Sequence, residues 1–127
     1  MADWTRNDLE RIGAADELQI ASARRDGTLR KPVTIWVVRV GDDIYVRAVK
    51  GREGAWFRHT QQQHKGQIEA GGVTKNVTYV DASTDETLNN AIDAAFQSKY
   101  RSYGATYVDP VIAAQARMTT LKLVPSA

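Results

Sequence analysis

Short runs of β-branched and aromatic residues, separated by glycines and Asp-Gly turns, fill the first two thirds of the chain. The run 33–38 has the highest strand propensity, and Pro32 just before it disfavours a helix. Residues 44–49 follow the turn 41–43, and this pattern predicts an antiparallel hairpin. Similar alternation predicts further strands over residues 17–24, 67–70, 73–80 and 118–124.

The length of the loop sets the register of this hairpin. A three-residue loop would place Val38 opposite Val46 on an apolar face. Tyr45 and Arg47 would then lie on the other face, a mixed surface suited to solvent, a partner subunit or a ligand. A shift of one residue would exchange the two faces.

Helices are predicted in four segments of the chain. Residues 3–12 predict a short helix, and a second short helix begins at Ala55. The most regular pattern starts behind the capping-box spacing of residues 83–86 and continues to Tyr100. A last short turn of helix is predicted over residues 109–116.

These elements predict one domain over residues 1–127, mainly β with flanking helices (α+β). Short connections favour a closed or nearly closed antiparallel barrel. Its parts are an N-terminal helix in 1–13, barrel strands and a short helix in 17–80, a main helix in 84–101 and a closing strand in 117–124.

The chain contains no cysteine. This excludes a disulfide scaffold, a thiol nucleophile and cysteine-ligated zinc or iron–sulfur sites. The first thirteen residues have no apolar leader segment, and no stretch approaches the roughly 18 apolar residues of a membrane span. We therefore expect a soluble, cytoplasmic protein with no membrane partner.

Positive charge is concentrated in one segment of the chain. Residues 24–65 contain ten Lys or Arg and four Asp or Glu, whereas the remaining residues contain seven and eleven. Closure of the hairpin would bring Arg30 and Lys31 beside Lys50 and Arg52 at one end. We interpret this cluster as a seat for an anionic ligand, and a solvated basic face is the alternative.

Glycines and tryptophans extend this candidate site. Gly51 would let backbone amides approach a ligand closely, and the helix that begins at Ala55 would direct its free N–H groups to the same place. Trp36 and Trp56 could flank a planar ring, or could belong to the core.

Other chemistries lack their motifs. The sequence has no Walker phosphate loop, no Gly-x-Gly-x-x-Gly fingerprint and no Gly-x-Ser-x-Gly elbow. His59 and His64 are the only histidines, and no metal site is predicted from them. Tyr100, Tyr103 and Tyr107 could line a pocket or pack on the surface. No residue is identified as catalytic.

Several of these segments together resemble the flavin-binding split-barrel superfamily. The similarity is to its pyridoxamine-phosphate-oxidase-like and deazaflavin-dependent nitroreductase-like members, and within them to the bacterial family called domain of unknown function 2255. The residues that carry it are 25–30, 33–36, 41–43, 49–51 and 55–56. The resemblance implies a six-stranded antiparallel split β-barrel of the flavin-binding type, a homodimer, and cofactor sites near the subunit interface.

The resemblance further implies an anionic small-molecule cofactor, either FMN or a deazaflavin. Lys50 and Gly51 would meet its phosphate, and residues 34–36 would follow the edge of its ring. Together with the basic cluster and the second tryptophan, the candidate cofactor-binding residues are Arg30, Lys31, Thr34, Ile35, Trp36, Lys50, Gly51, Arg52 and Trp56.

Three functions are compatible with this sequence. The first is an oxidoreductase that passes a hydride from the cofactor to a small organic acceptor. The second is a non-catalytic binding module for another anionic small molecule, favoured because Val49, Thr34 and His59 replace the serine, proline and asparagine usual in the relatives. The third is a nucleic-acid-binding barrel, the least favoured because only its basic component is evident.

Overall fold

The structure, a computed structural model, describes residues 3–126. Residues 1–2, which fall in the predicted range of the N-terminal helix, and residue 127 lie outside the described residues. The strands are β1 (Leu18–Ser22), β2 (Val33–Ile35), β3 (Val38–Val40), β4 (Asp43–Val46), β5 (Lys65–Ala70), β6 (Val73–Asp81) and β7 (Leu121–Pro125). The helices are α1 (Arg6–Ala14), α2 (Ala55–Gln63), α3 (Glu86–Lys99), α4 (Ala105–Ile112) and α5 (Ala114–Arg117), with 3-10 turns η1 (Gly51–Glu53) and η2 (Arg101–Tyr103).

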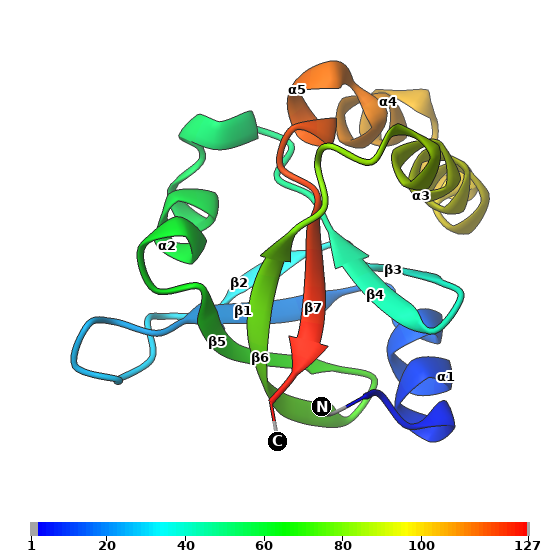
Figure 1. Cartoon of the computed structure of the whole chain (residues 1–127). Helices are drawn as coiled ribbons and strands as arrows, with labels where there is room; N and C mark the ends of the chain where they lie inside the picture. The colour runs from blue at the N-terminus through cyan, green and yellow to red at the C-terminus, as the bar shows by residue number, and fades with distance from the viewer. Residues whose placement is uncertain (1–2, 127) are drawn as a thin grey trace.

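All seven strands form one antiparallel sheet in the order β2-β1-β5-β6-β7-β4-β3. The sheet curls, with α2 on one side, α3 to α5 gathered on another and α1 near one end (Figure 1). The predicted mainly β fold with flanking helices is therefore confirmed. The sheet has one strand more than predicted because the run 33–40 is divided into two strands.

This divided run supplies both edges of the sheet. Ile35 of β2 pairs with Leu18 of β1, whereas Val38 of β3 pairs with Tyr45 of β4. Between the two strands, the Val37 N–H donates to the Tyr100 hydroxyl (3.1 Å), which itself donates to the Asp16 carbonyl (2.7 Å). A buried side chain thus satisfies the backbone where no strand does.

The predicted register of the hairpin is wrong by one residue. Val40 pairs with Asp43, so the loop contains two residues, and Gly41 adopts the positive φ of 62° that such a tight turn favours. Tyr45 consequently lies opposite Val38, and both are buried beneath α3. The face expected to meet solvent, a partner or a ligand is instead covered by helices.

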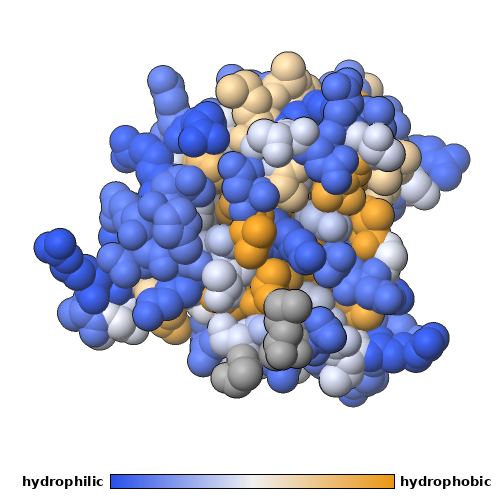
Figure 2. Space-filling view, viewed as in Figure 1, coloured by the Kyte–Doolittle hydropathy of each residue, from blue (hydrophilic) through white to orange (hydrophobic). Residues whose placement is uncertain are grey.

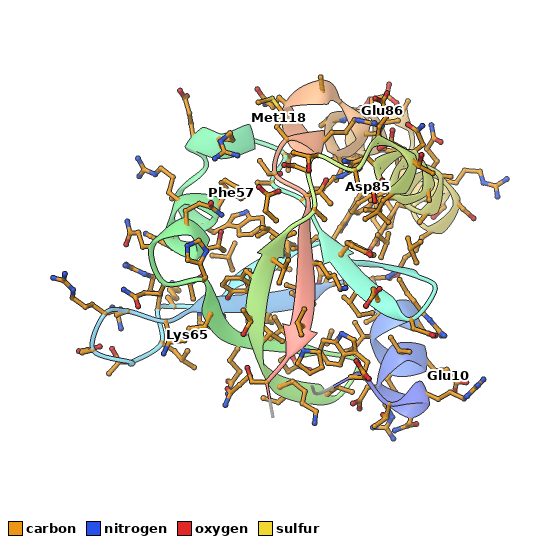
Figure 3. The ribbon with its side chains drawn as sticks, viewed as in Figure 1. Glu10, Phe57, Lys65, Asp85, Glu86 and Met118 are labelled. Atoms are coloured by element: carbon orange, nitrogen blue, oxygen red, sulfur yellow. The ribbon has the colours of Figure 1, made fainter. Side chains whose placement is uncertain are left out.

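Two apolar clusters hold these layers together. The first fills the inside of the curled sheet and includes Leu18, Ile68 and Leu123, with Phe57 of α2 packed against them. In Figure 3, Phe57 points from α2 toward the sheet. The second lies between the β3–β4 hairpin and α3, around Phe96. Burial of each large side chain contributes about 2 kcal/mol, so both faces of the hairpin stabilise the fold.

The ends of two helices differ from the sequence prediction. α3 is capped by Asp85, whose side chain accepts from the Leu88 N–H (3.0 Å), and not by the predicted pair of Ser83 and Glu86. α4 begins at Ala105, earlier than predicted, and contains Pro110 in its interior. Among residues 3–126, no helix combines the length and apolar character that a bilayer crossing requires.

Candidate ligand pocket between β2, α2 and α4

A cavity of about 590 Å³ lies between the edge strand β2, the start of α2 and α4. This volume is within the range of small-molecule and cofactor sites. The segment 33–36 forms one wall, segment 49–56 contributes a second, and Tyr107 and Pro110 stand on the third. The β2 wall is a sheet edge, because β2 has only β1 as a strand neighbour. Its outward backbone groups are therefore free of strand partners.

Trp36 and Trp56 both line the cavity. Trp36 is half-buried and stacks on Tyr100, with ring centroids 3.9 Å apart and planes 4° from parallel. Trp56 is also half-buried, and it packs against the inner cluster and edge-on to Phe57. Each tryptophan thus belongs partly to the core and partly to the cavity wall, and its place beside a planar ring stays a prediction.

Lys50 lies at the rim of the cavity, immediately before η1. Its side chain is exposed and, among the described residues, has no hydrogen bond or ion pair. The N-terminus of α2 reaches the same wall through Gly54 and Ala55. The first backbone bond of this helix runs from the Arg58 N–H to the Gly54 carbonyl (3.0 Å), which leaves the preceding N–H groups available.

Gly51 and Arg52 are placed differently from the sequence prediction. The Gly51 N–H already donates to the Ala48 carbonyl (2.9 Å), and its φ is 74°. A Cβ at this position would lie 2.9 Å from Cγ of Gln115, so glycine is required for packing against α5. Arg52 lies over the Phe57 ring at 5.5 Å. Neither residue lines the cavity.

Arg30 and Lys31 do not join Lys50 either. Arg30 donates to Oε1 of Gln62 on α2 (3.2 Å), and Lys31 is exposed before β2. Both residues lie outside the cavity wall, whereas Thr34, Ile35 and Trp36 belong to it. The predicted four-cation cluster does not form there because β2 pairs with β1 and not with β4.

Arg47 lies at the cavity wall but its guanidinium is fully engaged within the protein. Its five N–H groups donate to Thr120 Oγ1, Asp93 Oδ1, the Val111 carbonyl and both oxygens of Asn89. Burial lowers the pKa of Arg47, and Asp93 opposes this effect. Arg47 therefore ties the sheet to α3 and α4 and has no donor left for a ligand.

The cavity wall contains no His, Asp or Glu among the described residues. The titratable side chains on it are Arg47, Lys50 and Tyr107. In residues 3–126, no three His, Asp or Glu side chains come together as a metal-ligand set. The site can thus bind and orient a planar or anionic ligand, while its protein groups offer little acid–base chemistry.

The sequence prediction missed most of the α4 wall. Tyr107, for which the sequence allows either a pocket or a surface position, lines the cavity although it is 64% exposed. Thr106, Pro110 and Val111 were not anticipated, because the helix was expected to begin only near Asp109. Gly104, which has a positive φ of 90°, ends the turn η2 directly before α4.

Comparison with known proteins agrees with this architecture. No curated protein matches the sequence of this chain. An FAD-binding protein from Mesorhizobium loti aligns with a TM-score of 0.61 and 11% identity, over 99% of this chain and 93% of its own. A heme storage protein, HutZ, from Vibrio cholerae aligns with a TM-score of 0.64 and 14% identity. The alignment covers 93% of this chain and 87% of HutZ.

An F420 reductase gives a TM-score of 0.54 and 10% identity, over 93% of this chain and 92% of its own. At such identities the likeness establishes the fold, which is the flavin-binding split barrel that the sequence resembles. A family model matches residues 8–123. The chain therefore belongs to the family described as "Uncharacterized protein conserved in bacteria (DUF2255)", as the sequence predicted.

Proposed function

We propose that this chain binds a flavin-class cofactor, FMN or a deazaflavin, and passes a hydride to a small organic acceptor. The observation that carries the proposal is the cavity between β2, α2 and α4. The cavity is apolar and presents one tryptophan from each of two walls. At its rim lies a lysine that has no side-chain partner within residues 3–126.

The residues present fit a planar ring. Trp36 is held rigidly by its stacking on Tyr100, and Trp56 by packing against the inner cluster, so neither ring must be ordered when a ligand binds. The outward backbone groups of residues 33–35 can meet the polar edge of such a ring. Thr34 Oγ1 is itself occupied by Gln19 (2.7 Å), which favours the backbone for this role.

The residues also fit an anionic group at the rim. Lys50 supplies a full positive charge, and the N-terminus of α2 supplies unpaired N–H groups beside it. Arg47 does not contribute a donor, since all of its N–H groups are used within the protein. When bound, the cofactor supplies the hydride chemistry, and these side chains orient it and exclude water.

A homodimer follows from the family resemblance and is part of this proposal. Val33, Val49 and Tyr107 line the cavity and remain 39%, 47% and 64% exposed. Such apolar side chains around a cavity mouth are typical of a surface that a second copy covers. Sedimentation analysis is expected to give twice the chain mass, and Val49→Asp to shift the protein toward the monomer.

A second candidate function is a binding module without catalysis. It is favoured by the absence of His, Asp and Glu from the described cavity wall, and by the occurrence of the same fold in a heme storage protein. Under this alternative the cavity would hold another anionic planar molecule and no reductase activity would accompany binding.

The visible absorption spectrum of the purified protein, followed by fluorescence titration with FMN and with a deazaflavin coenzyme, tests the proposal. Saturable micromolar binding of one cofactor, followed by reduction of an acceptor such as a nitroaromatic, is the expected result. Binding without turnover would favour the second function, and binding of neither cofactor would overturn the first.

A further inference from the structure

Aromatic rings connect the wall of the cavity with the surface of the protein. Trp36 lines the cavity, whereas Tyr103, on the turn η2, is 46% exposed. The centroids of these two rings are 5.3 Å apart, and their planes are inclined by 55°. Tyr100, which is buried, stacks on Trp36 and has its centroid 5.9 Å from that of Tyr103. Indole and phenol are the most easily oxidised side chains of a protein without cysteine, so this contact joins two redox-active groups.

The backbone holds Tyr103 in this position. Its N–H donates to the Tyr100 carbonyl (3.0 Å), and the Gly104 N–H donates to the Arg101 carbonyl (3.1 Å), which together close a short turn directly after α3. Unlike the Tyr100 hydroxyl, the Tyr103 hydroxyl has no hydrogen-bond partner among residues 3–126. A phenol gives up an electron readily only when its proton leaves as well. Because Tyr103 is exposed, water can take that proton.

Tyr100 supports the indole but is unsuited to oxidation itself. Its hydroxyl donates to the Asp16 carbonyl (2.7 Å) and accepts from the Val37 N–H (3.1 Å), so its proton is held between backbone groups. Burial raises the pKa of Tyr100. The Lys99 Nζ lies 5.1 Å from the centroid of the same ring, and this positive charge disfavours a second one on the ring. An electron therefore passes directly from the exposed ring to the indole.

The other two tryptophans begin no such path. Trp56 also lines the cavity, but among the described residues its only ring contact is with Phe57, at 6.4 Å between centroids, and a phenyl ring resists oxidation. The surface over α2 is hydrophilic (Figure 2), and the exposed tyrosines of residues 3–126, Tyr103 and Tyr107, belong to η2 and α4. Trp4 is buried and makes no ring contact within the described part of the chain. The aromatic connection between cavity and surface thus begins at the β2 wall.

We propose that Trp36 and Tyr103 form an electron-transfer path, along which a small water-soluble reductant such as ascorbate reduces an oxidant in the cavity. Trp36 gives one electron to the oxidant, and Tyr103 returns one electron to Trp36 while its hydroxyl proton passes to water. The tyrosyl radical then takes a hydrogen atom from ascorbate. In sum, ascorbate loses one electron and one proton, the oxidant gains the electron, and both side chains are restored.

A chemical difference between the two rings gives the transfer its direction. At neutral pH a phenol that releases its proton to water is oxidised more easily than an indole. The missing electron therefore moves outward, from the half-buried Trp36 to the exposed Tyr103. The path rests on the proposed function for its oxidant, which would be a flavin-class cofactor excited by light. The transfer between the two rings depends on the chain alone and is tested without a cofactor.

Pulse radiolysis of the protein without cofactor tests this transfer. Azide radicals produced by the pulse oxidise indole faster than phenol at neutral pH, and tryptophanyl and tyrosyl radicals have distinct absorption bands. We expect part of the tryptophanyl absorption to decay in step with growth of the tyrosyl absorption, at a rate independent of protein concentration. Absence of this conversion, or a rate proportional to protein concentration, would overturn the path.

Variants assign the conversion to these two rings. Tyr103→Phe keeps the ring and its packing but removes the oxidisable hydroxyl, and it is expected to lose the fast conversion. Trp36→Phe is expected to lose it as well, whereas Tyr107→Phe, at the other exposed tyrosine, is the matched control and should retain it. If Trp36→Phe does not fold, Tyr103→Phe alone decides, because its hydroxyl is free of protein partners among the described residues. Conversion at the original rate in Tyr103→Phe, or its loss in Tyr107→Phe, would contradict the path.

Illumination of the protein saturated with FMN tests whether the path reaches the cavity. With ascorbate and without oxygen, the visible absorption of the bound cofactor is expected to bleach more slowly in Tyr103→Phe than in the unaltered protein. Equal bleaching would separate the two rings from the cavity and overturn the proposal. Failure of FMN and of a deazaflavin to bind would reject the proposed function alone, while the radiolysis still tests the transfer between the rings.

Discussion

Asp93 Oδ1 lies 2.5 Å from Nη1 of Arg47, and its other carboxylate oxygen meets Arg117. The side chain of Arg47 is fully buried, whereas those of Asp93 and Arg117 are about one fifth exposed. The Asp93 carboxylate therefore forms ion pairs with a buried arginine that follows β4 and with a more exposed arginine of α5. Arg47 lines the cavity, so this arrangement holds one of the side chains of the cavity wall.

Removal of Asp93 is expected to leave the charge of Arg47 buried without its partner. Asp93→Ala should lower the free energy of unfolding by about 3 kcal/mol, measured by urea denaturation. Arg117→Ala should cost about 1 kcal/mol, because it removes a more exposed partner. Asp109→Ala, an exposed residue of α4, is the control. Equal stability of Asp93→Ala and the control would contradict the role given to Arg47.

Lys50→Ala is expected to weaken binding of the cofactor by at least ~1.5 kcal/mol, the lower end for a charge-assisted contact. Lys50 is exposed and without a protein partner among the described residues, so stability should hardly change. Isothermal titration of the protein and the variant measures the difference. Lys75→Ala, on the exposed side of β6, is the matched control. An unchanged affinity in Lys50→Ala would show that no anionic group of the cofactor binds at this rim.

Lys99 makes stability depend on pH. Burial lowers its pKa to about 8 from the unfolded value of 10.5, while its Nζ donates to the Val37 carbonyl (2.7 Å). Between these pH values the unfolded chain holds a proton that the folded protein has lost, so raising the pH stabilises the fold. Because the side chain is partly solvated, we expect a gain on the order of 1 kcal/mol.

The pH series is compared with Lys99→Met to isolate this contribution. The difference in unfolding free energy between the two proteins should change across this interval and stay constant below pH 7. A difference that does not vary with pH would show that Lys99 keeps its ordinary pKa in the folded protein.

Gly66 lies in β5 where the neighbouring strands leave no room for a side chain. A Cβ there would collide with the Tyr79 hydroxyl and the Ala21 carbonyl, both fixed within the sheet. Gly66→Ala is therefore expected to lower the melting temperature and to cost about 3 kcal/mol. Gln67→Ala, next to it and half-exposed, should be nearly neutral. Comparable melting temperatures for both variants would contradict this packing.

The sequence predicted the strands and the fold class well, because alternation and turn residues are local signals. It did not predict where strand partners change. Residues 33–40 have uniform strand propensity, and only tertiary pairing divides them at Trp36 and Val37. The one-residue error in the hairpin had the same origin, since Gly41-Asp42-Asp43 is compatible with two loop lengths.

The candidate site was predicted in part. Residues 34–36, Lys50 and Trp56 line one cavity, and their roles toward a cofactor stay a prediction. The prediction of a basic cluster at the end of one hairpin was wrong. It assumed that the strand after Arg30 pairs directly with the strand before Lys50, whereas these strands are not neighbours in the sheet. Arg47 carried a signal that can be recognised afterwards: a charged residue within an apolar strand, which requires buried partners.

The place of β7 in the sheet has a consequence for biosynthesis. β7 is the last strand of the described residues, yet it lies between β6 and β4, and the Leu123 carbonyl accepts from Nε1 of Trp4 (3.0 Å). A nascent chain on the ribosome holds two separate groups of strands until residues 121–125 have emerged from the exit tunnel. The protein must therefore complete its fold after nearly all of these residues are synthesised, and a ribosome that stalls earlier leaves β4 and β6 with open edges.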